Sequence, residues 1–275
     1  MAKQAHTQHA NRPIGIFDSG IGGLTIAQAI TNVLPDESLV YFGDTAHLPY
    51  GDKSTDSIKY YAIRISQLLL QKNCKMIVIA CNTASAIAYE TVKDFVGNQA
   101  LVVNVIDPMV QEVSSNRKLK RVGVIGTKGT IKSNIYAKKM HEKNVNQEVC
   151  SLATPLLASM IEEGFFNNKI SQTIINDYLG RPKLKNIDSL ILACTHYPLI
   201  RSEIETFYGG KIAILDSALV VANAVKKLID QKKMATKLKK PVHHFYVSDF
   251  TQSFEKSTKY FFQKKIKLEE IAIWK

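Results

Sequence analysis

Residues 75–83 (KMIVIACNT) and residues 188–196 (DSLILACTH) are two similar stretches that decide how this chain folds. Each is a short, mostly apolar run that ends in Ala-Cys and is followed by two residues with hydrogen-bonding side chains. Such a run is typical of a buried β-strand, and the polar residues after it indicate where the strand ends. We therefore expect two buried strands, each with a cysteine, Cys81 or Cys194, at its carboxyl end.

A second pair of stretches repeats in the same order. Residues 14–20 (IGIFDSG) resemble residues 122–129 (VGVIGTKG), and each is an apolar run that leads into a glycine-bearing loop. The similar offsets of the two pairs favour two halves of like construction, although buried strands also resemble one another by chance. Ligands in open α/β sheets bind beyond the carboxyl ends of the strands, so facing halves would place both thiols across one cleft.

Short apolar runs alternate with longer amphipathic stretches along the 275-residue chain. The expected strands are residues 14–17, 39–42, 76–80, 101–106, 122–125, 190–193 and 211–215. Helical spacing is found in residues 56–72, 131–143 and 170–179, and the tail adds a strand at 245–247, a helix at 251–262 and a strand at 268–273. This alternation predicts an α/β fold of two similar, doubly wound parallel-sheet domains that face each other across a central cleft.

The overall composition is that of an ordinary globular protein, with 45% hydrophobic and 22% charged residues. No apolar run approaches the roughly 18 residues that a membrane span needs. The polar residues 1–13 lack the apolar stretch of a signal peptide. We therefore expect a cytoplasmic protein with no membrane association.

The formal net charge of +12 is concentrated toward the end of the chain. Residues 226–275 carry 13 Lys and five acidic residues. A solvated helix and linker is the favoured interpretation. Nucleic-acid binding through this basic third ranks second, because no aromatic residue is interleaved between 226 and 240.

The four cysteines form no CxxC pair, and we expect them to be reduced thiols. Cys81 and Cys194 each stand where a strand gives way to a helix or turn, whose free amides favour a thiolate. A buried structural cysteine is the competing interpretation. Hydrogen-bonding residues directly follow both of them and favour a functional role, whereas Cys74 and Cys150 lack such neighbours and are expected to be structural.

Residues 18–23 (DSGIGG) form a glycine-rich loop after the first expected strand. Its glycines let the backbone approach a ligand, while Asp18 and Ser19 offer a carboxylate and a hydroxyl. Neither this loop nor residues 126–130 (GTKGT) match the GxGxxG or GxxxxGK[ST] nucleotide-binding patterns. A small anion such as an amino-acid carboxylate therefore fits better than a diphosphate, and residues 49–51 (PYG) would add backbone amides nearby.

A metal site is not expected. Cys194 and His196 lie two residues apart, but zinc needs three or four converging ligands and no second local pair accompanies them. His243 and His244 are adjacent, so on a strand their side chains would point to opposite faces.

Six motifs span most of the chain, namely GIFDSGIGGL (15–24), YFGDTAHLPYG (41–51), ACNTAS (80–85), VIGTKGT (124–130), MIEEG (160–164) and LACTHYPL (192–199). In this order and spacing they resemble the glutamate racemases, which are part of the cofactor-independent aspartate/glutamate racemase superfamily. The tail beyond residue 218 is a looser match. The resemblance implies a first domain of residues 1–103 completed by residues 220–275, a second domain of residues 104–219, and a glutamate-binding cleft between them.

The resemblance also implies roles for individual residues. It makes Cys81 and Cys194 the two catalytic acid/bases, one on each face of the substrate α-carbon, with Asp18 assisting Cys81 and His196 assisting Cys194. Glu162 would be the acidic partner of His196, and its neighbour Glu163 is the less favoured choice. The implied substrate-binding residues are Asp18, Ser19, Tyr50, Gly51, Asn82, Thr83, Thr127, Thr195 and His196.

The expected activity is therefore interconversion of L-glutamate and D-glutamate without a cofactor, by a homodimer that supplies D-glutamate for bacterial peptidoglycan. A thiol has a reference pKa of about 8.5, so one cysteine can act as a thiolate base and the other as a thiol acid. Aspartate racemase is the alternative, because a methylene in the substrate is worth only about 1 to 3 kcal/mol. A DNA-associated binding protein that uses the basic C-terminal third is the alternative from another class.

Overall fold

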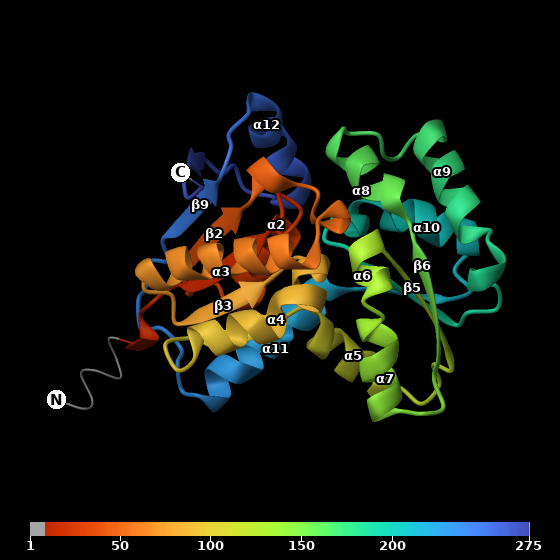
Figure 1. Cartoon of the computed structure of the whole chain (residues 1–275), viewed down its shortest axis with the longest axis horizontal. Helices are drawn as coiled ribbons and strands as arrows, with labels where there is room; N and C mark the ends of the chain where they lie inside the picture. Colours follow the sequence, from red (N-terminus) through yellow and green to blue (C-terminus); the bar gives the residue numbers. More distant parts are fainter. Residues whose placement is uncertain (1–8, 275) are drawn as a thin grey trace.

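The computed structural model describes residues 9–274, so residues 1–8 of the polar start and residue 275 lie outside the described residues. Its strands form two separate sheets (Figure 1). The first sheet has the order β10-β9-β2-β1-β3-β4 and consists of β1 (Ile14–Asp18), β2 (Leu39–Gly43), β3 (Met76–Ile79), β4 (Leu101–Asn104), β9 (His243–Val247) and β10 (Leu268–Glu270). The second sheet has the order β6-β5-β7-β8 and consists of β5 (Arg121–Gly126), β6 (Glu148–Ala153), β7 (Ser189–Ala193) and β8 (Ala213–Asp216).

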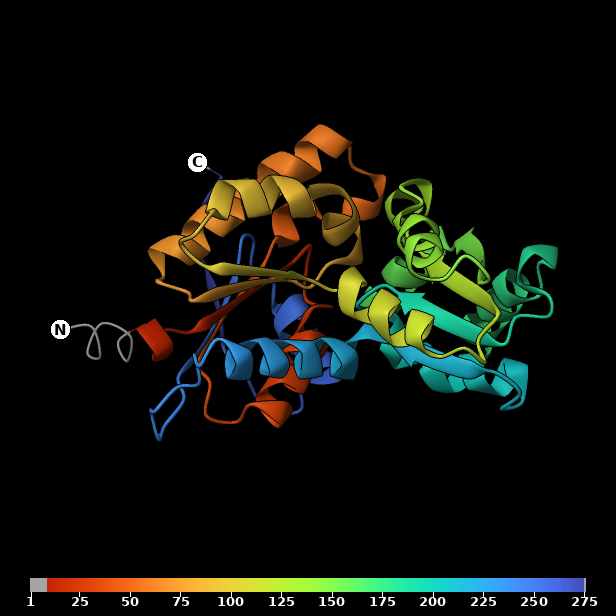
Figure 2. The same ribbon diagram turned by 90° about the horizontal axis from the view of Figure 1, so that it is seen from below.

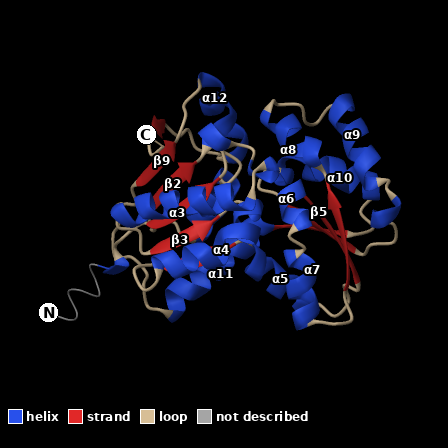
Figure 3. Ribbon diagram, in the orientation of Figure 1, coloured by secondary structure: helices blue, strands red, loops and turns tan. Residues whose placement is uncertain are grey.

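Helices surround both sheets (Figure 3). The α-helices are α2 (Leu24–Val33), α3 (Thr55–Gln71), α4 (Asn82–Val96), α5 (Ile106–Ser115), α6 (Lys128–Lys132), α7 (Ile135–Lys143), α8 (Pro155–Glu162), α9 (Lys169–Leu179), α10 (Arg201–Tyr208), α11 (Ser217–Gln231) and α12 (Gln252–Phe261). Short 3-10 helices are η1 (Thr45–His47), η2 (Tyr50–Asp52), η3 (Pro182–Leu184) and η4 (Tyr197–Ile200).

The first sheet is a layer between two pairs of helices, with α3 and α4 on one face and α2 and α11 on the other (Figure 2). Side chains alternate along β1 to fill both faces. Ile16 belongs to the apolar cluster that contains Leu24 of α2 and Val221 of α11, whereas Phe17 belongs to the cluster that contains Ile65 of α3. Burial on both faces explains why these strands are continuous apolar runs in the sequence.

The chain passes between the domains twice, from β4 into α5 and from β8 into α11. Helix α5 packs against α7 of the second domain and against α11, which also packs along α2 of the first domain. The apolar cluster that contains Ile16 continues through Val113 of α5 and Val225 of α11 to Val124 of β5. The two domains are therefore joined by shared core packing and by two chain crossings.

The predicted fold class is confirmed, since every neighbouring strand pair in both sheets is parallel. Some element predictions were wrong. Strand β6 was not predicted, because it is a half-exposed edge strand and lacks a continuous apolar run. The helix expected at 131–143 is divided into α6 and α7 at Asn134, whose left-handed φ of 54° no right-handed helix continues through. The last strand ends at Glu270 rather than at residue 273.

The domain limits predicted after residues 103 and 219 fall inside regular elements, β4 and α11. A division near residues 105 and 216 is the one that keeps both elements whole. The limits themselves stay a prediction. Within residues 9–274, no helix combines the length and the apolar character needed to span a membrane.

Candidate active site

A small enclosed cavity of about 30 Å³ lies between the two domains, beyond the carboxyl ends of their central strands. Every predicted site residue except Asp18 lines it, and the full lining consists of Ser19, Pro49, Tyr50, Gly51, Cys81, Asn82, Thr83, Thr127, Ala158, Glu162, Ala193, Cys194, Thr195 and His196. One water needs about 10–15 Å³ of such space. The cavity of this structure is therefore smaller than an amino acid.

Asp18, at the end of β1, lies beneath the cavity and is fully buried. Its Oδ2 accepts hydrogen bonds from the backbone N–H groups of Gly20 (3.2 Å) and Gly23 (3.0 Å), and its Oδ1 accepts one from the Thr195 hydroxyl (3.4 Å). Burial raises the pKa of Asp18, although the charge of His196 and the two N–H groups oppose the shift. The carboxyl is thus held rigidly at the boundary between the domains.

Cys81 occupies the N-cap position of α4, directly after β3. Its Sγ accepts from the Ala84 N–H (3.5 Å) and donates to the Ser19 hydroxyl (3.7 Å). The amides of this turn were expected to favour a thiolate. Instead, burial and the nearby Asp18 carboxylate outweigh these hydrogen bonds and raise the pKa of Cys81 to about 12. In the closed protein Cys81 is therefore a protonated thiol at neutral pH.

Cys194 follows β7, and its Sγ lies 3.6 Å from Nδ1 of His196. The Nε2 of His196 lies 2.8 Å from Oε1 of Glu162, an ion-pair distance at an angle outside hydrogen-bond geometry. Burial alone would lower the pKa of His196, but the charge of Glu162 and the contact with Cys194 raise it well above its ordinary value. Glu163 is exposed at the end of α8, and Phe261 of α12 meets the imidazole edge-on at 5.5 Å.

Hydroxyl and amide groups join the two domains on the other side of the cavity. The Thr83 hydroxyl lies 2.8 Å from that of Thr127 and 3.2 Å from that of Thr130. The Tyr136 hydroxyl donates to Oδ1 of Asn82 at 2.7 Å. These side chains therefore hydrogen-bond to one another across the two domains.

Two glycines allow the two domains to approach each other closely at the cavity. A Cβ at Gly51 would lie 2.7 Å from Cβ of Thr127, and a Cβ at Gly22 would lie 2.6 Å from both Thr195 Oγ1 and His196 Cε1. Contacts this short are incompatible with any side chain at either position. Gly51 was a predicted site residue, whereas Gly22 was not singled out.

Sequence reasoning missed four further residues that shape the site. They are Gly22, Tyr136, Ala158 and Ala193. Gly22 stands in the quoted glycine-rich loop, and Ala193 directly precedes Cys194, so proximity to a motif could have indicated both. Tyr136 and Ala158 lie on helices with ordinary amphipathic spacing and are buried; Ala158 lines the cavity, and Tyr136 reaches it only through Asn82.

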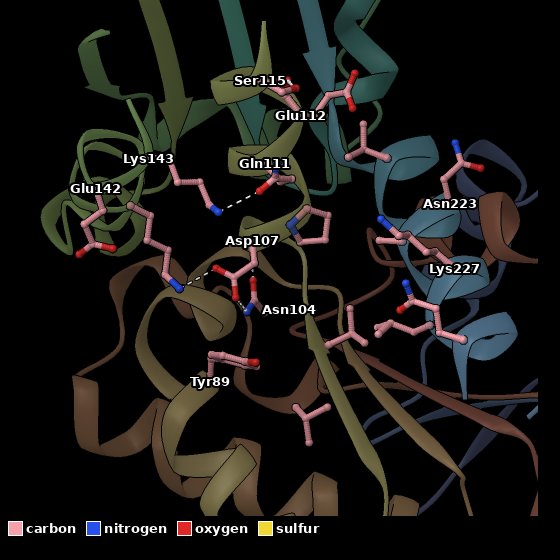
Figure 4. A pocket seen from close by; sticks show the side chains of 18 residues that line it. Tyr89, Asn104, Asp107, Gln111, Glu112, Ser115, Glu142, Lys143, Asn223 and Lys227 are labelled. Carbon is pink, nitrogen blue, oxygen red and sulfur yellow. Dashed lines mark hydrogen bonds and ion pairs between the residues drawn. The ribbon is translucent and has the colours of Figure 1, made fainter. Parts of the chain in front are cut away.

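A much larger hollow of about 880 Å³ lies elsewhere, between α4, α5, α7 and α11 (Figure 4). Asp107 accepts from Lys139 and from Asn104 there, and Lys143 donates to Gln111. It is lined by none of the predicted site residues and by no cysteine. Chemistry rather than size therefore identifies the small cavity as the candidate active site.

The described part of the chain, residues 9–274, holds no group of three or more His, Cys, Asp or Glu side chains arranged to bind a metal ion. All four cysteines are free and buried. Burial raises the pKa of Cys74 to about 12, and Cys74 packs in the core against the first sheet, away from the cavity.

Two α/β domains that each present a cysteine to one shared cavity define a class of enzyme, one that can remove a proton with one thiol and deliver a proton with the other. The chain belongs to the Asp/Glu/Hydantoin racemase family, which matches residues 24–225. This range includes both Cys81 and Cys194, whereas Asp18 and Ser19 precede it. The family confirms the prediction of a racemase.

Individual relatives agree with this assignment. The chain is 41% identical to a glutamate racemase of Chlorobaculum parvum over 250 residues, 90% of this chain and 92% of the relative. It is similar to the crystal structure of the Francisella tularensis glutamate racemase in complex with D-glutamate, with a TM-score of 0.91 and 40% identity over 96% of this chain and 99% of that one. An aspartate racemase homologue of Pyrococcus horikoshii, at 19% identity and a TM-score of 0.56 over 80% of this chain and 99% of that one, shares the fold.

Proposed function

We propose that the protein interconverts L-glutamate and D-glutamate by proton transfer at the α-carbon, where one of Cys81 and Cys194 removes a proton and the other delivers one. The observation that carries the proposal is that these two cysteines come from different domains and line the same closed cavity. The relatives support glutamate as the substrate, because the Chlorobaculum parvum protein is a glutamate racemase and the Francisella tularensis structure contains D-glutamate.

The reaction needs one cysteine as thiolate and the other as thiol. The thiolate removes the α-proton from one face, and the electron pair of the C–H bond is delocalised into the substrate carboxylate. The second thiol then delivers its proton to the opposite face of the α-carbon. The two cysteines finish with exchanged protonation states, and proton exchange with solvent restores the starting state.

The neighbours of the cysteines suit this chemistry. Asp18 carries a carboxyl whose raised pKa lets it exchange a proton near Cys81, and His196 does the same beside Cys194, supported by Glu162. Preorganised donors stabilise the negative charge that develops during proton removal. We assign substrate binding to the groups with hydroxyl, amide or backbone N–H donors at the cavity, which are Ser19, Tyr50, Gly51, Asn82, Thr83, Thr127 and Thr195.

Isotope incorporation in deuterium oxide tests the proposal. At early conversion of L-glutamate, the D-glutamate formed should carry α-deuterium while the remaining L-glutamate carries almost none, because the delivering thiol is already equilibrated with solvent. The reverse reaction should give the mirror result. Product that retains the α-hydrogen of its substrate would exclude the two-base mechanism, and absence of any D-glutamate would exclude the activity.

No added cofactor should be needed. The protein should keep full activity after dialysis against a chelator and should show no pyridoxal absorbance. Loss of activity that metal or pyridoxal phosphate restores would contradict this proposal. The same assay with L-aspartate distinguishes the shorter substrate, which we expect to react more slowly.

The cellular role follows from the product. D-glutamate made in the cytoplasm would supply bacterial peptidoglycan synthesis. The expected homodimer stays a prediction, which light scattering after size-exclusion chromatography would check.

A further inference from the structure

Asp44, in the loop after β2, is a fully buried carboxylate that does not line the cavity. Its Oδ2 accepts a hydrogen bond from the Tyr50 hydroxyl at 2.7 Å. Its Oδ1 accepts from the Ser248 hydroxyl at 2.8 Å and from the indole N–H of Trp274 at 3.0 Å. Nδ1 of His47 lies 3.1 Å and 3.0 Å from the two oxygens. A residue outside the cavity thus connects a cavity-lining side chain to the far end of the sequence.

Trp274 is the single tryptophan of the chain, and it is held in place from several sides. Its ring meets the His47 ring edge-on at 4.6 Å and the Tyr61 ring edge-on at 5.3 Å. Arg64 of α3 donates to the Ile273 carbonyl at 2.8 Å. The segment that follows β10 is therefore fixed against α3.

The hydrogen bonds divide the carboxylate into two ends. Trp274 and Ser248 both donate to Oδ1, while Oδ2 faces the Tyr50 hydroxyl. Buried polar networks are rigid when every member has a partner, and loss of one donor leaves the remaining groups free to shift. Tyr50 is itself buried, begins η2 and directly precedes Gly51, which approaches Thr127 across the closed cavity.

We propose that Asp44 and Trp274 are positioning residues for residues 50–53. They fix the Tyr50 ring and the Gly51 backbone for substrate binding. The inference rests on the proposed function, because it assigns a role toward the substrate of that same site. Trp274 acts through Asp44 and Tyr50, so its loss should weaken glutamate binding while the cysteines keep their proton chemistry.

A double-mutant cycle on the full chain tests this inference. Trp274→Phe removes the indole N–H but keeps an aromatic ring, and Tyr50→Phe removes the hydroxyl at the other end of the network. We expect Trp274→Phe to raise KM for D-glutamate about three- to tenfold and to change kcat by less than about twofold. The double variant should resemble Tyr50→Phe alone, because the two changes break one connected path.

Tyr60→Phe is the matched control. The Tyr60 ring lies 6.2 Å from that of Trp274, its side chain is 56% exposed, and its hydroxyl is not part of the Asp44 network. We expect this variant to keep the wild-type KM. Additive effects of Trp274→Phe and Tyr50→Phe, or an unchanged KM in Trp274→Phe, would overturn the inference.

Hydrogen exchange on the wild-type protein gives an independent measurement. D-glutamate should slow amide exchange in residues 271–274 as well as in residues 50–53, although residues 271–274 do not line the cavity. Slower exchange in residues 50–53 alone would show that this segment is not coupled to Trp274. A wild-type protein that neither binds nor racemises glutamate would refute the proposed function, whereas an active enzyme without these effects would refute only the positioning role.

Discussion

Cys81 and Cys194 occupy equivalent places in their two domains, each after a central strand, but their partners differ. Cys81 lies near the buried carboxyl of Asp18, and burial together with that charge raises its pKa to about 12. Cys194 instead lies 3.6 Å from His196, whose raised pKa is maintained by Glu162. A carboxylate disfavours charge on a nearby sulfur, whereas a protonated imidazole is a cation that can pair with a thiolate.

The difference shows that similar folding of the two halves does not produce similar chemistry. The proposed two-base reaction needs one thiolate and one thiol at the start of each turnover. Cys81 and Cys194 have different charged neighbours, and we propose that this difference serves the two roles.

The largest effect should come from removing either sulfur. Cys81→Ala and Cys194→Ala should each lower the racemisation rate by on the order of 10³-fold or more, because a positioned acid or base contributes about 10²–10⁴-fold and each reaction direction needs both. Polarimetry or circular dichroism of glutamate would measure the rate.

Cys74→Ala and Cys150→Ala serve as controls for that experiment. Both sulfurs are buried outside the cavity, so these variants should stay active, with packing losses of about 1 kcal/mol. Substantial activity in Cys81→Ala or Cys194→Ala would show that the two cysteines are not the acid/base pair.

Substitution of the residues beside the two cysteines should lower the rate less than removal of either sulfur, and the effect should differ between the two domains. Asp18→Asn and His196→Asn should lower kcat by on the order of 10²-fold and change KM less, since they act on proton transfer. L-glutamate and D-glutamate are equal in energy, so kcat/KM must fall equally in both directions. The asymmetry should therefore appear in kcat and in the isotope effect of α-deuterated substrate, measured separately from L- and D-glutamate. Equal isotope effects in both directions for both variants would contradict separate roles.

The smallest expected effect concerns stability and its dependence on pH. The folded pKa of His196 is raised, so its pairing with Glu162 stabilises the protein fully below the unfolded pKa of about 6.5 and is lost as pH rises through the folded value. Glu162→Gln should therefore lower the free energy of unfolding by about 1 to 3 kcal/mol at pH ~6, where a carboxylate is ionised and the imidazole is protonated, and by less as the pH rises. Urea unfolding across a pH series would measure it, with Glu163→Gln as the exposed control. If the loss of unfolding free energy in Glu162→Gln instead grew with pH, protonated His196 would not be the form that Glu162 stabilises.

Residue patterns alone placed Asp18, Cys81 and Cys194 at strand ends, whereas the role of Glu162 was implied only by the resemblance to the racemase family. Apolar runs buried on both faces identify the strands, and the residue after each run is placed at the carboxyl edge of its sheet. The edge strand β6 was missed because partial exposure removes the apolar signal. Tyr136 was missed because its contact with Asn82 joins positions far apart in the chain.

The sequence by itself determined the alternation of strands and helices, the placing of Cys81 and Cys194 at strand ends, and the polar groups beside them. These features depend on local periodicity and on neighbouring residues, which the chain carries in its order. Only the tertiary structure decided how tightly the two domains enclose both thiols, that Cys81 has a raised pKa despite its N-cap position, and that Trp274 reaches Asp44. Burial, charge proximity and closure are properties of residues that are distant in the sequence, such as Asp44 and Trp274, which are 230 positions apart, so they exist only once the core has packed.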